Sequence, residues 1–333
     1  MPLSPELAPM IESLAAITAA LDEKSDFALV AHQDADADSL GSALAFAEYL
    51  DQRGKRVAVL APKPVPQGLA YLPGFPRVNR EDMSPGSTVI AFDAGSPSRF
   101  GDLGQRIAEA PLTILFDHHI SNDGFGDLGV VDRQAAATGM VVLSLLRQWG
   151  AEITPDMATN LYAAIFTDTG GFRHDNTSGP VLHAAAGLVD LGADPAFVAL
   201  RSYKWRPATT LRLQALAASA AHYELGGRLI WTAVTQRMLH EAGAELEETE
   251  GIIDLLQTLD TMLCAVLFKE AGERLTKVSL RTRGRLAAHE LVADLGGGGH
   301  FRAAGAELRS GLLEAEEAVL RRARAAVLEE GEG

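Results

Sequence analysis

The chain has 333 residues and a mass of 35.3 kDa, a length that suits two ordinary domains. Its 47% hydrophobic and 22% charged residues are typical of a globular protein and exclude a disordered one. Its 29 basic and 44 acidic side chains give a net charge of −15. That charge argues against binding of long duplex nucleic acid, because neutralising a phosphate backbone requires clustered Lys and Arg. Most of the excess negative charge lies in residues 1–200, which have 12 basic and 25 acidic side chains. Residues 201–333 have 17 basic and 19 acidic side chains.

The cellular compartment is predicted from features that the sequence lacks. Cys264 is the single cysteine, which excludes an intramolecular disulfide and suits a reducing cytoplasm. No run of 18 apolar residues occurs, so we expect no transmembrane helix and no membrane partner. The first residues lack the basic segment of a signal peptide, and Ser4 and Pro5 instead indicate the cap and first turn of a helix. We therefore expect a cytoplasmic protein.

Short apolar runs alternate with helical patterns over residues 1–190. The strand-like runs, rich in Val, Ile, Leu and Phe, are residues 27–32, 56–60, 88–93 and 112–117. Helical spacing of apolar residues occurs at 40–50 and 138–148, and helices are indicated from Thr154 and from Gly179 onward. Strands that alternate with helices predict a doubly wound α/β domain with a mostly parallel sheet, over residues 1–190.

The rest of the chain has a different pattern. Residues 191–222 lack a strand signal and carry Leu and Ala at helical spacing, which predicts a helical connector. A second, smaller α+β domain is expected over residues 223–333. Its predicted strands are residues 228–234, 263–269 and 275–281, and its predicted helices are residues 248–259 and 315–328.

Carboxylates and histidines gather where the apolar runs of the first domain end. They are His32, Asp36 and Asp38 after the first run, Asp93 after the third, Asp117, His118 and His119 after the fourth, and Asp168 where a further apolar run meets a glycine turn. Functional groups of open α/β sheets lie beyond the carboxyl ends of the strands. These residues are therefore expected to converge on one rim, although they are far apart in sequence.

Such a cluster requires cations, because its carboxylates would otherwise repel one another in a desolvated cleft. His together with several Asp, without Cys, is a ligand set suited to Mn²⁺. Two such ions bridged by a carboxylate are the apparatus of phosphoester hydrolysis. Any single Asp could instead cap a helix or solvate a loop, but the combined pattern favours the metal site.

The second domain contains a glycine–histidine segment, residues 296–300, in which four glycines precede His300. Glycines suit a site where the backbone approaches an anion closely, so Gly297, Gly298 and Gly299 are candidate ligand contacts. Arginines suit bidentate contacts with phosphate, and the candidates are Arg281, with Ser279 on the same strand face, Arg302, and Arg99 and Arg173 after the metal motifs. The Lys of a P-loop is missing and no G-x-G-x-x-G follows the first strand, which excludes kinase and dehydrogenase sites of those types.

These motifs resemble those of the DHH phosphoesterase superfamily. The resemblance lies in the Asp117-His118-His119 triplet, the segment from His32 to Asp38, Asp93 and Asp168. Residues 296–305 are similar to the GGGH-x-x-AAG signature of the DHH-associated domain in the RecJ-like branch. The size and the motif set most resemble the bacterial oligoribonuclease (nano-RNase)/pAp phosphatase subgroup.

The resemblance implies a role for each residue. His32 and Asp36 would hold one metal ion, Asp38, His118 and Asp168 would hold the second, and Asp93 would bridge them. His119 would face the substrate phosphate or the leaving group, and Asp117 would orient the histidines. The glycine–histidine segment and the nearby arginines would bind the substrate. One departure is Asp34-Ala35, where the family commonly has Asn-Pro, and this change removes no ligand.

The implied function is a two-metal phosphodiesterase and exoribonuclease, dependent on Mn²⁺ with Mg²⁺ as the alternative. It would degrade single-stranded oligonucleotides of about two to five nucleotides to mononucleotides, and it would also convert pAp to AMP and phosphate. A phosphodiesterase of cyclic or linear dinucleotides (c-di-AMP or pApA) remains the alternative. A single-strand DNA exonuclease or a nonenzymatic nucleotide sensor fits less well. The oligomeric state stays open, with a homodimer among the options.

Overall fold

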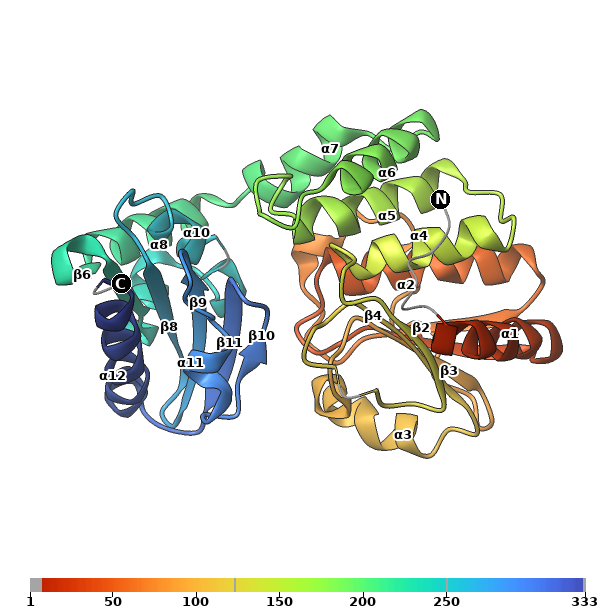
Figure 1. Cartoon of the computed structure of the whole chain (residues 1–333), viewed down its shortest axis with the longest axis horizontal. Coiled ribbons are helices and arrows are strands. Elements are labelled where there is room, and N and C mark those ends of the chain that lie inside the picture. The colour runs from red at the N-terminus through yellow and green to blue at the C-terminus, as the bar shows by residue number, and fades with distance from the viewer. Residues whose placement is uncertain (1–7, 123, 250, 332–333) are drawn as a thin grey trace. The chain divides into compact units, whose positions relative to one another are not determined.

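The computed structural model describes residues 8–122, 124–249 and 251–331 (Figure 1). The predicted helix start at Ser4 and Pro5 lies outside these residues. The chain divides into two compact units, Met1–Lys204 and Trp205–Gly333. The division falls inside the segment 191–222 expected to be a helical connector, and its second half packs with the second unit.

The first unit is built on a five-stranded parallel sheet with the order β2-β1-β3-β4-β5. Its strands are β1 (Asp26–Val30), β2 (Arg56–Leu60), β3 (Thr88–Phe92), β4 (Thr113–Asp117) and β5 (Leu128–Val131). Its helices are α1 (Ala8–Glu23), α2 (Ala37–Gln52), α3 (Gly104–Ala108), α4 (Thr138–Gln148), α5 (Pro155–Asp168), α6 (Gly179–Asp190) and α7 (Pro195–Ala199), followed by a π-helical turn at Leu200–Lys204. The predicted doubly wound parallel sheet is confirmed.

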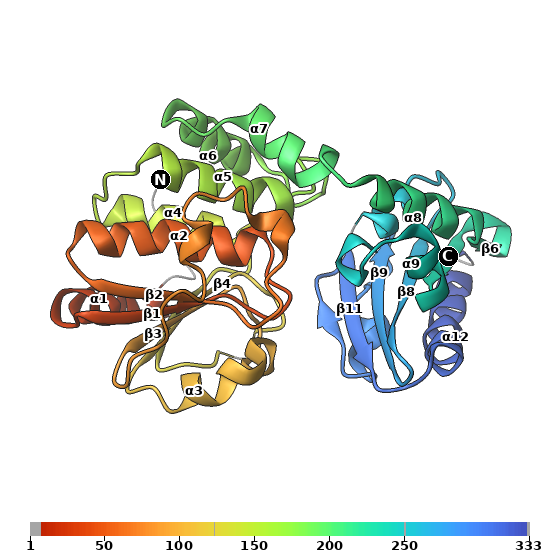
Figure 2. The same cartoon turned by 180° about the vertical axis from the view of Figure 1, so that it is seen from behind.

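Both faces of this sheet are apolar, because its side chains alternate between two hydrophobic layers. In β1, Phe27 and Leu29 pack in the larger layer, whereas Ala28 and Val30 pack in the smaller one. Helices α2, α4 and α5 lie over one face, and α3 lies on the other (Figures 1 and 2). Burial on both faces explains why the strands appear in the sequence as continuous apolar runs.

The strand order places the functional loops side by side. After β1 the chain adds β2 on one side, and then returns to add β3 on the other side of β1. At such a reversal the two connecting loops leave in opposite directions, which opens a crevice at the carboxyl ends of the strands. His32 follows β1 and Asp93 follows β3, so both residues lie at this reversal.

The second unit is a mixed six-stranded sheet with the order β10-β11-β9-β8-β7-β6, in which only β7 and β8 are parallel. Its strands are β6 (His222–Glu224), β7 (Leu229–Val234), β8 (Cys264–Gly272), β9 (Leu275–Thr282), β10 (Gly298–Gly299) and β11 (Ala303–Leu308). Its helices are α8 (Ala208–Ser219), α9 (Gln236–Ala242), α10 (Ile252–Leu256), α11 (Glu290–Ala293) and α12 (Leu312–Gly331). Residues of α12 fill the hydrophobic layer on one face, and those of α8, α9 and α10 fill the layer on the other.

Several elements have no clear signal in the sequence. Strand β5 is four residues long and contains Gly129, and β11 is composed largely of Ala and Gly, which have low strand propensity. The predicted helix at 248–259 is reduced to α10, and α12 begins three residues before the predicted start. Asp168 is the last residue of helix α5, which is the helix predicted from Thr154 onward.

Among the residues that the structure describes, no helix is by itself both long and apolar enough to cross a membrane. Helices Gly179–Asp190 and Pro195–Lys204 meet that length and composition only as a pair, and the pair is bent by 116°.

Candidate metal centre and catalytic residues

His32 is held by the loop that follows β1. Its ring is 4% exposed, and its Nδ1 lies 2.7 Å from the backbone oxygen of Gln33. An imidazole that donates from Nδ1 to a carbonyl keeps a lone pair on Nε2. That Nε2 lies 3.3 Å from Asp93 Oδ2 and 3.7 Å from Asp36 Oδ2. Arg99 is exposed beside it, with Nη2 at 3.4 Å from His32 Nδ1, and its backbone oxygen accepts from the Gln33 N–H at 2.6 Å.

Asp38 is fully buried in the first turn of α2 and is held by the start of α4. Its two oxygens accept hydrogen bonds from the backbone N–H groups of Thr138 (2.7 Å) and Gly139 (2.8 Å). The first N–H groups of a helix lack partners within the helix, so a carboxylate placed there is stabilised. A Cβ at position 139 would lie 2.6 Å from the Cβ of Ala164, so glycine allows α4 to begin this close to α5.

Asp93 lies between the two groups of candidate ligands. Its backbone is in the left-handed region, with φ of 59°, which is unusual for a residue other than glycine and is typical of strained functional positions. Its Oδ2 lies 3.3 Å from His32 Nε2, and its Oδ1 lies 3.4 Å from His118 Nε2. Thr138 donates to Oδ1 at 2.9 Å. Each oxygen of this buried carboxylate therefore faces a different histidine.

His118 repeats the arrangement of His32. It is 4% exposed, its Nδ1 lies 3.1 Å from the backbone oxygen of Ala135, and its Nε2 faces carboxylates. They are Asp168 Oδ2 at 3.3 Å, Asp93 Oδ1 at 3.4 Å and Asp38 Oδ2 at 3.7 Å. In both histidines an acceptor nitrogen thus points at acceptor oxygens, a contact that is unfavourable until a proton or a cation lies between them.

The structure brings the sequence-predicted ligands into two adjacent groups. The ligand atoms of His32, Asp36 and Asp93 lie within 4.8 Å of one another, as do those of Asp38, His118 and Asp168. Asp36 and Asp168 have side chains that are 48% and 27% exposed, whereas the others are buried, so the site opens to solvent at these two aspartates. This donor set of imidazole nitrogens and carboxylate oxygens fits divalent ions such as Mn²⁺ or Mg²⁺.

The pKa values within the site show how strongly it favours positive charge. Burial raises the pKa of Asp38 well above its usual range, and the charges of Asp93 and Asp168 reinforce the effect. Burial also raises the pKa of Asp168 to about 7. Burial acts to lower the pKa of His32, but the carboxylates of Asp36 and Asp93 outweigh it and raise this pKa to about 10. The carboxylates therefore repel one another and attract protons, and divalent ions would relieve the repulsion.

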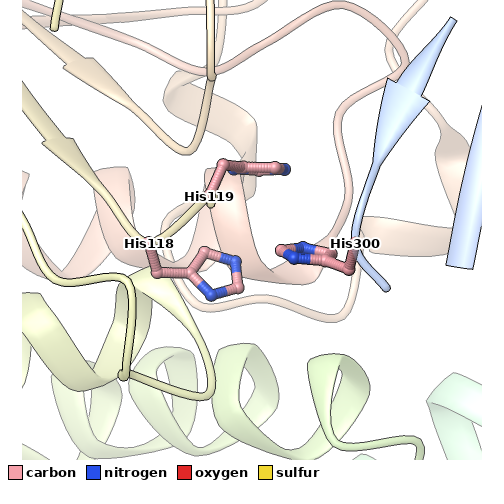
Figure 3. Close-up of side chains that lie close together, drawn as sticks. All are labelled: His118, His119 and His300. Carbon is pink, nitrogen blue, oxygen red and sulfur yellow. The ribbon is translucent and has the colours of Figure 1, made fainter. Parts of the chain in front are cut away.

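Asp117 and His119 form a separate pair beside the two groups. His119 Nδ1 donates to Asp117 Oδ1 at 2.7 Å, and its side chain is 22% exposed, against none for Asp117. The rings of His118 and His119 extend from the loop after β4, with centroids 5.0 Å apart (Figure 3). The hydrogen bond fixes the tautomer of His119 and leaves its Nε2 as the nitrogen available to a ligand.

Arg173 lies in the loop that follows Asp168. Its Nε donates to the backbone oxygen of Gly170 at 2.5 Å, and its guanidinium carbon lies 5.3 Å from the ring centroid of Tyr203. The side chain is exposed. The structure therefore places Arg173 in the loop directly after α5, which ends at Asp168, and it places Arg99 in contact with His32.

In the second unit, Ser279 and Arg281 lie on one face of β9, alternating with buried residues. Ser279 is opposite Gly305 of β11, and Arg281 is opposite Ala303. The Nη1 of Arg281 donates to the backbone oxygen of Leu280 at 2.9 Å, and Arg302 Nη1 donates to the backbone oxygen of Gly284.

The glycine run is explained in part by packing within the protein. A Cβ at Gly297 would lie 2.5 Å from the backbone oxygen of Gly305, and one at Gly299 would lie 2.5 Å from that of Ala303. These two glycines allow the segment to lie against β11, so the absence of side chains there serves the fold. Gly298 has no atom within 4 Å of an added Cβ, so its surface remains open.

Comparisons with known proteins agree with this geometry. Residues 26–165 match the model of the DHH family, N-terminal domain, and residues 230–329 match that of the DHHA1 domain. The bifunctional oligoribonuclease and PAP phosphatase NrnA of Thermus thermophilus is 35% identical over 302 residues, covering 89% of this chain and 88% of that protein. The chain belongs to the DHH family of phosphoesterases. It is a hydrolase of phosphoester bonds, as the sequence predicts.

Solved structures place this DHH protein in the same fold. An exopolyphosphatase-related protein from Bacteroides fragilis superposes with a TM-score of 0.87 at 21% identity, covering 96% of this chain and 98% of that one. RecJ from Thermus thermophilus, crystallised with Mn²⁺, has a TM-score of 0.57 at 14% identity and covers 98% of this chain and 56% of that one. At these identities the similarity concerns the fold alone.

Asn122 is a site residue that the sequence analysis missed. It is 3% exposed, and its amide nitrogen donates to Asp117 Oδ2 and, at 3.3 Å, to the backbone oxygen of Ala94. Its Oδ1 accepts from the Gly124 N–H at 2.6 Å, which fixes the orientation of the amide. Asn122 therefore holds Asp117, which in turn holds His119. Its position three residues after the Asp-His-His triplet was the signal available in the sequence.

Replacing Asn122 with alanine is expected to lower kcat by roughly 10- to 100-fold, with KM and metal content unchanged. Asp117 would lose the partner of one oxygen and would no longer fix the His119 ring. Steady-state kinetics and elemental analysis of the purified variant test this. Gln105→Ala, which removes an exposed amide that donates to Glu109, is the matched control. A folded Asn122→Ala enzyme with the wild-type kcat would contradict the role.

Proposed function

We propose that this DHH enzyme is a two-metal phosphodiesterase that degrades oligonucleotides of about two to five nucleotides to mononucleotides and removes the 3′-phosphate of pAp, using Mn²⁺. The observation that carries the proposal is the buried Asp93 carboxylate, whose two oxygens face two separate groups of ligands. The relative from Thermus thermophilus, which is named a bifunctional oligoribonuclease and PAP phosphatase, supports the choice of substrate.

In this proposal His32 and Asp36 would hold one ion, Asp38, His118 and Asp168 would hold the other, and Asp93 would contribute to both. Bound ions would activate water and neutralise charge on the phosphoryl oxygens. His119, oriented by Asp117, would contact the phosphate or the leaving oxygen through Nε2.

The second unit supplies the substrate contacts in this proposal. Arg281 and Ser279 share one strand face, and Gly298 is exposed, with open space where a side chain would extend. His300 and Arg302 follow in the same segment, and Arg99 and Arg173 in the first unit are further candidates for phosphate contacts. A short substrate held by such local groups needs no long basic track, which agrees with the net charge of −15.

The compartment proposed for the enzyme is a reducing cytoplasm. Cys264 lies in β8, and burial raises the pKa of its thiol to about 12, so this cysteine is packed as a small apolar side chain. A thiol of this kind needs no oxidising environment and forms no structural cross-link.

A cleavage panel with purified enzyme and Mn²⁺ tests the function. The substrates are RNA of two to five nucleotides, a long single strand, pAp, cyclic di-AMP and pyrophosphate. We expect the highest kcat/KM on the short oligonucleotides and release of phosphate from pAp. Turnover of pyrophosphate alone, of the long strand alone, or of cyclic di-AMP alone would contradict the proposal. The last outcome would establish the alternative, a cyclic-dinucleotide phosphodiesterase.

A further inference from the structure

An exposed aromatic side chain stands at the tip of the hairpin that joins β10 to β11. The His300 N–H donates to the Ala303 backbone oxygen at 2.7 Å, and the Ala303 N–H donates back to that of His300 at 3.3 Å. The two residues at the tip are therefore Phe301 and Arg302. Gly, Asn and Asp are the usual residues at the tip of a two-residue hairpin, so Phe and Arg there call for an explanation other than turn formation.

The hairpin tip is firmly attached to the rest of its unit. The backbone oxygen of Phe301 accepts from the Ala288 N–H at 2.7 Å and from Thr282 Oγ1 at 3.2 Å. Nevertheless 40% of Phe301 is exposed to solvent. The backbone of the tip is therefore fixed while the residue stays partly exposed.

The ring itself is also held in place. The guanidinium carbon of Arg302 lies 4.9 Å from the centroid of the Phe301 ring, and Arg302 is anchored by its hydrogen bond to the Gly284 backbone oxygen. The ring of His289 also lies near the Phe301 ring, with centroids 6.4 Å apart and planes at 53°. A cation over an aromatic face stabilises both partners. Phe301 is thus a rigid, partly exposed aromatic surface.

The groups around Phe301 suit the phosphate of a nucleotide, and its ring suits the base. Arg302 and the preceding His300 carry groups that suit phosphate, and Arg281 is opposite Ala303, which directly follows the tip. Aromatic side chains beside such groups are the usual platforms on which bases of single-stranded nucleic acids stack. Every base has a π-face, so such a platform binds without sequence preference.

We propose that Phe301 stacks on a nucleobase of the substrate and that Arg302 holds its ring in place. The inference rests on the proposed function and deepens it, because it adds a base contact to a site otherwise composed of phosphate-binding groups. The base contact would make the enzyme select nucleotides over phosphodiesters that lack a base.

The test compares two substrates, an RNA dinucleotide and the same phosphodiester made from two abasic residues. Phe301→Ala is expected to raise KM for the dinucleotide roughly 5- to 100-fold and to leave kcat and the abasic KM near the wild-type values. Phe301→Trp should restore the dinucleotide KM, since it provides an aromatic face. Leu313→Ala removes a more exposed apolar side chain of the same unit (80% exposed, against 40% for Phe301). It should change neither KM nor kcat for either substrate.

The outcomes separate this inference from the proposed function. If the wild-type enzyme cleaves no dinucleotide, the proposed function fails. If it does, an unchanged KM in Phe301→Ala overturns the stacking role. Equal losses on the dinucleotide and the abasic substrate also overturn it, because Phe301 would then act on the fold of the hairpin. Failure of Phe301→Trp to restore KM, while Phe301→Leu restores it, would show an apolar contact instead of stacking.

Discussion

Asp93→Asn is expected to lower kcat on a short oligonucleotide by about 10³-fold or more, because both groups of ligands depend on this one carboxylate. Its Oδ2 faces His32 and its Oδ1 faces His118, so an amide would present a neutral oxygen to one group and an N–H donor to the other. Divalent ions supply several kcal/mol of transition-state stabilisation, and about 4 kcal/mol corresponds to the expected loss.

Steady-state kinetics and the metal content of the purified protein check this prediction together. Asp102→Asn is the matched control, because Asp102 is exposed in the same connection between β3 and β4 and lies outside both groups of ligands. The control should retain wild-type kcat and two bound ions. Substantial turnover by a folded Asp93→Asn enzyme would refute the two-metal assignment, whatever its metal content.

Adding Mn²⁺ to protein stripped by a chelator is expected to raise the melting temperature of the first unit by roughly 5–10 °C. The stripped site keeps several carboxylates buried together, and their mutual repulsion is relieved when cations bind. A ligand present at a hundredfold excess over its Kd stabilises the folded state by about 2.7 kcal/mol, and one kcal/mol shifts the transition of a domain of this size by about 2–4 °C.

Differential scanning calorimetry over a range of Mn²⁺ and Mg²⁺ concentrations measures this shift, with K⁺ at matched ionic strength as the control for screening. Asp93→Asn should show a smaller shift than the wild-type protein, and Asp102→Asn should show the full shift. If neither divalent ion shifts the wild-type transition, the two groups of ligands do not form a metal site. The difference between the ions would identify the one that binds more tightly.

The positions of the site loops could be predicted because they follow from a general rule of parallel sheets. Strands buried on both faces appear as continuous apolar runs, so the four strands β1 to β4 are visible in the sequence. Residues that follow the carboxyl ends of β1, β3 and β4 must then share a rim. His32, Asp93 and His118 are separated by tens of residues in sequence, yet their convergence required no contact information.

Other parts of the fold gave no periodic signal. Strand β11 consists largely of Ala and Gly, and Gly297 and Gly299 lie close to its backbone, so neither segment carries the alternating large side chains that would reveal a strand. The role of Gly297 and Gly299 in this packing was likewise invisible, because a glycine required by a neighbouring backbone and one required by a ligand look alike in sequence.

Fold class and family could be read from the sequence alone, and so could a set of candidate site residues, because apolar periodicity and motif spacing are local properties of the chain. How those candidate residues face one another could be seen only in the folded structure. Four features depend on backbone conformation and on tertiary contacts. They are the directions of the two Asp93 oxygens, the hydrogen bonds from α4 to Asp38, the hydrogen bond from Asn122 to Asp117, and the exposure of Phe301. Most of these contacts join residues that are tens of residues apart, and the short one between Asn122 and Asp117 depends on the conformation of the loop, so the chemistry of the site could be predicted before its geometry.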